Sequence, residues 1–439
     1  MTEQLKLKLN DSKATRWGAL VIVAFTMMAA YYVNDVVAPL KTMLETDLAW
    51  SSTDFGFFTG GYSFLNVFFL MLIWGGLILD RFGIRFTGKL ATILMVGGTA
   101  LEYYAMTGLA GADATLFGIN EIFGYKTGVF VAFAGYSIFG VGAEVAGITV
   151  SKIIAKWFKG KELATAMGVQ VALARIGSQA GYAVAIPLAR AFGISTPVLL
   201  GLVLLLGGMI AFFIFAVMDK KLDKQMEAAA IAAGTEDEEE KFSFKDVKNI
   251  LVNPGFWLIA LLCVLFYSCV FPFQKFASEL MIIKYGINEN VAGTFAGLPA
   301  LGALILTPVF GGFIDKRGKS ASIMLLGSAM LICVHFIYAI PDINYWLVAI
   351  VLMIILGIAF SLVPSAMWPA VAKIFPVSQL GTAYALIFFI QNIGLWGIPT
   401  LIGWVLDAYC ISGKKPDGTN MYDYTVPMCI FTGIACLSL

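Results

Sequence analysis

The sequence predicts an all-α membrane protein of twelve transmembrane helices, arranged as two six-helix bundles of similar construction. Three observations support this prediction: the composition, the spacing of the apolar segments and a repeat between the two halves. Of the 439 residues, 59% are hydrophobic and 13% are charged, and a soluble chain of this length does not carry so much apolar surface. The net charge of +1 argues against a nucleic-acid partner and leaves membrane lipid as the expected surroundings.

Apolar segments long enough to cross a bilayer recur along the whole chain. A span needs about 20 apolar residues because a helix rises about 1.5 Å per residue. The last segment is short, and we expect the chain to stop before the natural end of that helix. The expected spans cover residues 17–40, 54–79, 88–109, 127–155, 162–189, 196–218, 256–283, 291–314, 320–340, 346–372, 378–406 and 425–439.

Basic residues flank these spans unevenly. If the amino terminus lies inside, the cytoplasmic segments hold 20 Lys and Arg residues, the opposite side holds six, and three lie within spans. Because basic flanks are retained in the cytoplasm during insertion, this asymmetry predicts that both termini are cytoplasmic.

A strongly charged segment between the sixth and seventh spans divides the chain into two halves. Its acidic run, Glu236 to Glu240, is interpreted as the solvated face of a linker, with a docking site for a cytoplasmic protein as the alternative. The predicted organisation is a cytoplasmic amino terminus (1–16), a first bundle (17–218), a cytoplasmic linker (219–250) and a second bundle (251–439).

Short motifs recur between the two halves at similar offsets. "WGAL" at Trp17 aligns with "WLIA" at Trp257, 240 residues later, and "DRFG" at 80–83 aligns with "DKRG" at 315–318, 235 residues later. Repeated bundles of this kind are typical of membrane transporters.

A third motif pair falls in the same order at a smaller offset. "ELATA" at Glu162 aligns with "QLGTA" at Gln379, 217 residues later, and an additional loop at 111–126 accounts for the smaller offset. The same register matches Arg175 with Asn392. The two halves are therefore expected to be related by pseudo-symmetry.

The chain resembles the major facilitator superfamily through "GLILDRFGIR" after the second span and its echo after the eighth. The segments at 142–178 and 364–395 further resemble the branch that contains the lysosomal dipeptide uniporter of animals and its bacterial relatives. This resemblance implies transport by alternating access and a gating role for the motif, whereas a purely topogenic role for its charges is the alternative. The implied gating residues are Gly76, Asp80, Arg81, Gly83, Arg85, Asp315, Lys316, Arg317 and Gly318.

Two opposite charges are expected near the middle of the membrane. Arg175 lies about 20 Å and Glu144 about 17 Å from the cytoplasmic ends of adjacent antiparallel spans. A charge at that depth needs a partner, a water-filled cavity or a ligand. A direct ion pair would be structural, whereas a gap would hold a zwitterion between a carboxylate and a guanidinium. The resemblance implies that Glu144 and Arg175 bind the amino and carboxyl ends of a dipeptide.

Other polar and aromatic residues are weaker candidates for the binding site. Asp35 and Lys275, matched by the repeat, could be ligand groups, an outer gate pair or charges facing the vestibule. Aromatic residues in such helices also serve as packing or interface anchors. His335 is expected to be structural rather than a proton relay. The further candidates for lining the cavity are Tyr31, Trp368, Gln391 and Asn392.

The favoured function is a secondary carrier of small zwitterions, most readily dipeptides, by facilitative uniport. The alternative is a proton-coupled symporter of peptides, amino acids or organic anions. An enzyme is not expected, because no nucleotide loop or hydrolase motif is present and the aqueous segments are too small for a catalytic domain. The six cysteines have no metal-ligand spacing, so no cofactor or metal is expected.

The expected location is a bacterial inner membrane. The Asn-x-Ser sequon, Asn10 to Ser12, lies on the predicted cytoplasmic side, which argues against a glycosylated lysosomal protein. We expect a monomer without the accessory glycoprotein of the animal carrier.

Overall fold

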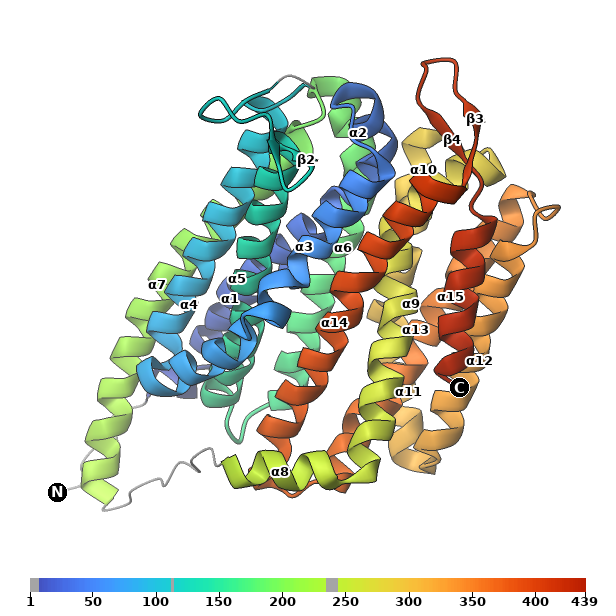
Figure 1. The fold of residues 1–439 in the computed structure, drawn as a ribbon. Coiled ribbons are helices and arrows are strands. Elements are labelled where there is room, and N and C mark those ends of the chain that lie inside the picture. Colours follow the sequence, from blue (N-terminus) through green and yellow to red (C-terminus); the bar gives the residue numbers. More distant parts are fainter. Residues whose placement is uncertain (1–7, 112–113, 234–243) are drawn as a thin grey trace.

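The computed structural model describes residues 8–111, 114–233 and 244–439 as two bundles of helices that stand side by side (Figure 1). The first half contains two short 3-10 helices, η1 and η2, before and after its first helix. Its elements are η1 (Leu9–Asp11), α1 (Lys13–Val36), η2 (Ala38–Leu40), α2 (Lys41–Asp47), α3 (Ser52–Phe68), α4 (Met71–Thr107), β1 (Glu121–Ile122), β2 (Tyr125–Lys126), α5 (Thr127–Trp157), α6 (Leu163–Phe192) and α7 (Thr196–Ala233).

The second half repeats the same order of long helices and ends in a short one. A helix on the surface, α8, precedes it, and a two-stranded hairpin separates its last two helices. Its elements are α8 (Phe244–Val252), α9 (Pro254–Tyr285), α10 (Glu289–Ala296), α11 (Leu298–Arg317), α12 (Ser320–Ala339), α13 (Trp346–Ile374), α14 (Val377–Tyr409), β3 (Ile411–Lys414), β4 (Asn420–Tyr422) and α15 (Thr425–Leu437).

The helices account for the expected spans. Within the described chain, eight helical segments are each long and apolar enough to cross a membrane, and α3 with α4 forms a ninth, bent by 58°. The helix α4 contains parts of two spans, because Gly83 interrupts it with a positive φ of 73° that favours glycine. The remaining expected spans correspond to α6 and to the 13-residue α15. The prediction of an all-α membrane protein with two bundles is confirmed.

The two ends of the molecule differ. One end carries α8 and the described start of the chain, and we call it the linker side (Figure 1). The other end carries α2, α10 and both pairs of short strands, and we call it the hairpin side (Figure 1). Between the halves, α3 packs along α14, and α6 packs on α10 and α11.

The charged segment between the halves is more helical than the sequence analysis expected. The helix α7 extends to Ala233, beyond the predicted end of the first bundle at residue 218, because Lys, Gln, Glu and Ala are good helix formers outside the membrane. The predicted linker, 219–250, thus begins within α7 and ends within α8. Its acidic run, Glu236 to Glu240, lies outside the described residues.

Candidate functional site

A cavity of about 1000 Å³ lies between the two halves. At one end it reaches Gly76, Asp80 and Val247 on the linker side, and at the other it ends at Asn34 and Lys275. Its wall is mostly apolar, so the few charged groups on it stand out. Six of the predicted binding residues line it: Tyr31, Glu144, Arg175, Lys275, Trp368 and Gln391.

Glu144 projects from α5 into this cavity and is half-buried. The hydroxyl of Tyr62 on α3 donates a hydrogen bond to its Oε1 at 3.1 Å. Gly140, one turn earlier on α5, allows the close approach of α3, since a Cβ there would lie 2.0 Å from the carbonyl oxygen of Tyr62. The local packing thus orients one carboxylate oxygen and leaves the carboxylate on the cavity wall.

Arg175 projects from α6 and is also half-buried. Its guanidinium lies over two rings, 5.7 Å from the centre of Tyr31 on α1 and 5.0 Å from the centre of Phe360 on α13. Rings at such distances stabilise a cation through their negative faces. Its buried Nε has no hydrogen-bond partner in the part of the chain that the structure describes. The guanidinium is therefore positioned by aromatic rings from both halves, while its donors are left for a ligand.

The two charges do not neutralise each other. Among the residues that the structure describes, neither Glu144 nor Arg175 takes part in an ion pair within 4.0 Å. Of the two arrangements that the sequence left open, the structure has the gap and not the structural pair.

The second half contributes an aromatic wall. The indole Nε1 of Trp368 donates to the Tyr267 hydroxyl at 3.3 Å, and the Tyr384 hydroxyl donates to the Trp368 carbonyl oxygen at 3.1 Å. Trp368 also stacks on Phe388, with ring centres 4.9 Å apart. These bonds fix the ring faces that a substrate side chain would contact.

Asn392 is not on the cavity wall, contrary to its assignment as a binding residue. It is buried, and its Nδ2 donates to the carbonyl oxygen of Phe388 at 2.9 Å. Successive side chains on a helix point about 100° apart. Because Gln391 points to the cavity wall, the side chain of Asn392 points away from the cavity. The repeat therefore matched Arg175 with the right turn of α14 but with the wrong side chain.

Asp35 and Lys275 pair with each other across the two halves. Lys275 Nζ on α9 lies 3.1 Å from Asp35 Oδ1 on α1 and donates to the carbonyl oxygen of Asn34 at 2.6 Å. The Ser178 hydroxyl donates to the other carboxylate oxygen at 2.6 Å. Lys275 lines the cavity at its hairpin-side end, and Asp35 lies behind it, off the cavity wall. The pair therefore forms the hairpin-side end of the cavity, which we call its floor.

The motif after the second span makes its ion pairs within the first half. Asp80 pairs with Lys152 of α5 at 3.0 Å. Arg85 pairs with Asp219 of α7 at 3.4 Å and also with Asp223. Arg81 is exposed and lies over the ring of Phe82.

The two glycines of this motif behave differently. Gly83 makes a tight turn, with a φ of 73° that favours glycine. Gly76 does not lie at a close contact between helices, because a Cβ there would meet nothing within 4 Å. It faces the cavity instead.

The echo of the motif after α11 shows the same turn. Gly318 ends α11 with a φ of 66°. Lys316 is exposed, and Arg317 lies 5.1 Å from the ring centre of Phe313 on its own helix. The side chain of Asp315 lies outside the described part of the chain.

Sequence reasoning missed several residues that complete the site. Tyr62, Phe360 and Tyr267 hold the charged or aromatic groups in place, yet as aromatic residues in apolar spans they resemble core. His335 is buried between Phe273 and Phe431 and bonds a backbone carbonyl, as expected of a structural histidine. Among the described residues, no group of three or more His, Cys, Asp or Glu side chains could hold a metal.

Comparison with known proteins places these features in a family context. Residues 20–397 match the family model described as Major Facilitator Superfamily. The human lysosomal dipeptide transporter MFSD1 is 29% identical over 409 residues, which cover 90% of this chain and 81% of the relative. Its chicken counterpart, from Gallus gallus, is 33% identical over 287 residues, which cover 62% of each chain.

Solved structures share the fold at low sequence identity. The nucleoside transporter NupG superposes with a TM-score of 0.70 at 13% identity, and the match covers 96% of this chain and 97% of that one. A bacterial homologue of the human lysosomal transporter Spinster, inward-facing and unoccupied, gives 0.66 at 14% identity over 97% and 94%.

Proposed function

Because the chain belongs to the Major Facilitator Superfamily and is an integral membrane transporter, we propose that its substrates are small zwitterions, above all dipeptides, carried by facilitative uniport. One observation carries this proposal. Glu144 and Arg175 face one cavity from neighbouring helices, and neither takes part in an ion pair with another residue that the structure describes.

The two groups suit the two ends of a peptide. A guanidinium binds a carboxylate through two parallel hydrogen bonds, and a carboxylate binds an ammonium through a charge-assisted bond. Arg175 would therefore hold the substrate carboxylate, and Glu144, oriented by Tyr62, would hold its ammonium. The aromatic wall around Trp368 offers apolar surface for substrate side chains of varied shape.

The relatives support the same substrate class. The MFSD1 proteins with 28% to 33% identity to this chain are named as lysosomal dipeptide transporters. The 29% identity to the human protein extends over 90% of the chain and so includes both helices that carry the charged pair.

The arrangement of the two ends fits alternating access. The cavity opens toward the linker side, and the Asp35–Lys275 pair closes it below the hairpin side. Rocking of the two halves about the midplane would expose Glu144 and Arg175 to the opposite compartment. A proton-coupled symporter remains the alternative, and it differs in predicting acidification of the compartment that receives the peptide.

Orientation and location are part of the proposal. We infer that the linker side faces the cytoplasm of a bacterial inner membrane, because the basic residues gather on that side. Labelling of exposed Cys variants at Asp342 and Lys316 with a membrane-impermeant reagent in intact cells tests this orientation. Only Asp342→Cys should react if the inference is right.

The binding test uses a dipeptide of two alanines together with its N-acetylated and C-amidated forms. The wild type should bind the free dipeptide and lose at least about tenfold in affinity for either blocked form, since each blocked end loses one charge-assisted bond. Arg175→Ala should bind the free and C-amidated forms equally, and Glu144→Gln should bind the free and N-acetylated forms equally. Calorimetry on purified protein measures each affinity.

Two controls keep this test specific. Lys414→Met and Asp342→Asn remove charges from exposed hairpin-side positions and should leave every affinity unchanged. Flux of radiolabelled dipeptide into liposomes, recorded with an internal pH dye, then separates uniport from proton symport. An organic-anion carrier would instead tolerate Glu144→Gln, and binding that ignores both blocked ends would refute the assignment.

A further inference from the structure

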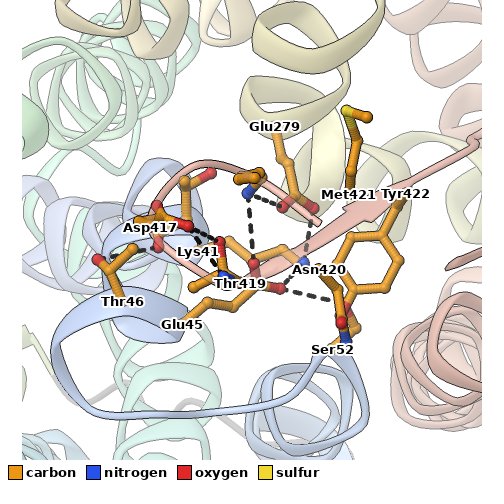
Figure 2. A network of polar contacts seen from close by, with 12 residues as sticks. Lys41, Glu45, Thr46, Ser52, Glu279, Asp417, Thr419, Asn420, Met421 and Tyr422 are labelled. Atoms are coloured by element: carbon orange, nitrogen blue, oxygen red, sulfur yellow. Dashed lines mark hydrogen bonds and ion pairs between the residues drawn. The ribbon is translucent and has the colours of Figure 1, made fainter. Parts of the chain in front are cut away.

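A buried cluster of four charges joins the two halves on the hairpin side, and its residues are not among those that line the cavity (Figure 2). Lys41 and Glu45 lie on α2 of the first half, Glu279 lies on α9, and Lys415 lies in the turn between β3 and β4. The side chains of Lys41, Glu45 and Glu279 are at most 5% exposed, and that of Lys415 is 15% exposed. Charges so deeply buried need close partners.

One ammonium serves both carboxylates. Lys41 Nζ lies 2.5 Å from Glu45 Oε1 and 2.6 Å from Glu279 Oε2 (Figure 2). The Ser52 hydroxyl donates to Glu45 Oε1 at 3.2 Å, and the Tyr424 hydroxyl donates to Glu279 Oε2. On the Lys41 side of the cluster, one oxygen of each glutamate therefore has close polar partners.

The opposite side of the cluster is not. Lys415 Nζ lies 3.7 Å from Glu45 Oε2 and 3.8 Å from Glu279 Oε1, beyond hydrogen-bonding distance. All three of these buried atoms are without a hydrogen-bond partner among the described residues. Glu45 Oε2 and Glu279 Oε1 are thus buried close to a second carboxylate without a hydrogen bond from the described residues. Burial and a like-charged neighbour both favour the protonated form of a carboxyl group.

Each half contributes one positive and one negative charge to the cluster, so its contribution has no net charge. Lys41 and Glu45 can pair within α2 as residues four apart, and Glu279 and Lys415 can pair within the second half. The halves can therefore separate on this side without stranding an unpaired charge. A proton on either glutamate upsets this balance, because it removes one attraction across the halves and leaves Lys41 and Lys415 to repel each other.

We propose that Glu45 and Glu279 form a proton-binding site, and that a proton taken up there from the hairpin-side compartment opens the hairpin side of the transporter. The partly exposed Lys415 marks where the cluster meets water on that side. This proposal rests on alternating access but not on the identity of the substrate. The other titratable groups that face the cluster are Tyr422 on β4, Tyr424 before α15 and Asp407 at the end of α14.

The test measures opening directly, without substrate. Spin labels are attached at Glu121→Cys and Asp342→Cys, two exposed hairpin-side positions in different halves, in a variant whose native cysteines are replaced. In lipid nanodiscs, the ratio of long to short label distances should rise about tenfold from about pH 7.5 to about pH 5, the change expected if the open conformation binds the proton ten times more tightly.

Two variants and two matched controls decide the outcome. Glu279→Gln and Glu45→Gln should each show the raised ratio at both pH values, because the neutral amide imitates the protonated acid. Lys414→Met and Asp47→Asn alter exposed neighbours of the cluster and should keep the wild-type response. A wild type whose distances ignore pH, or glutamine variants that respond as the wild type does, would overturn the proposal whether or not dipeptides are the substrate.

Discussion

The hairpin side and the linker side both carry many charged residues, but they use them differently. On the hairpin side three ion pairs join the two halves: Lys41 to Glu279, Lys275 to Asp35, and Arg190 to Glu289. On the linker side the named motif residues pair inside their own half, as Asp80 does with Lys152. Ion pairs between the halves therefore occur at the hairpin side, where the cavity ends. The motif pairs within one half occur at the linker side, to which the cavity extends.

A second contact shows how deeply this difference is built into the chain. Asp407, at the end of α14, accepts hydrogen bonds from the backbone N–H groups of Ser52 and Thr53 at 3.3 and 2.6 Å. These are the free N–H groups at the start of α3, so a residue of the second half stabilises the first turn of a helix in the first half. Opening the hairpin side must break this contact as well as the ion pairs.

The largest expected effect comes from removing the shared ammonium of the hairpin side. In Lys41→Met, Glu45 and Glu279 would remain buried with only the distant Lys415 near them. Breaking a buried pair in this way costs about 3–5 kcal/mol, so we expect the hairpin side to open and the melting temperature to fall. Distances between labels at Glu121 and Asp342 measure the opening.

The exposed neighbour Lys414 provides the comparison for this variant. Lys414→Met should leave both the distances and the melting temperature unchanged, since its exposed ammonium donates to the side chain of Asn420, a residue of the same hairpin. A Lys41→Met protein that stays closed and as stable as the wild type would show that the cluster does not hold the halves together.

The next largest effect concerns the floor of the cavity. Asp35→Asn and Lys275→Met each strand one buried charge and should raise the open fraction by about three- to tenfold, whereas the double variant should lie closer to the wild type than either. Label distances and dipeptide affinity are measured together. If the distances change and the affinity does not, Asp35 and Lys275 are a gate pair. If the affinity falls, they are ligand groups. If neither changes, they are charges that only face the vestibule.

Much of the fold followed from periodic properties of the sequence. The apolar segments and the basic flanks predicted the helices, because a bilayer imposes a fixed length on each span. The same reasoning placed Glu144 and Arg175 at matching depth, since helix rise is constant. Depth along a helix is thus readable from sequence.

What could not be read is the direction in which a side chain points and what lies across the boundary between the halves. Gln391 and Asn392 have the same depth, and only the packing of α14 decides that Gln391 faces the cavity. Glu279 lies more than 200 residues after Lys41 and Glu45. In the sequence, all three look like ordinary charges near the ends of spans. Contacts between distant segments carry no local signal.

The smallest expected effect is on the linker side, at a pair that lies within the first half. Arg16 donates a hydrogen bond to Glu162 at 3.0 Å, and Trp17 donates another at 3.1 Å, and these bonds lower the pKa of the Glu162 carboxyl to about 2. A carboxyl whose pKa is lower when folded stabilises the protein above its unfolded pKa and loses that contribution as the pH falls toward 2. The contribution is therefore constant between about pH 5 and pH 8.

Glu162→Gln should lower the melting temperature by no more than about 2 °C, because exposed pairs contribute little. The difference from the wild type should be the same at about pH 5 and about pH 8 and should shrink below about pH 4. Label distances on the hairpin side should not change, because this pair does not cross between the halves. A clear opening or closing of the hairpin side in this variant would mean that pairs within one half also set the conformation, and the contrast between the two ends would then not explain which end is open.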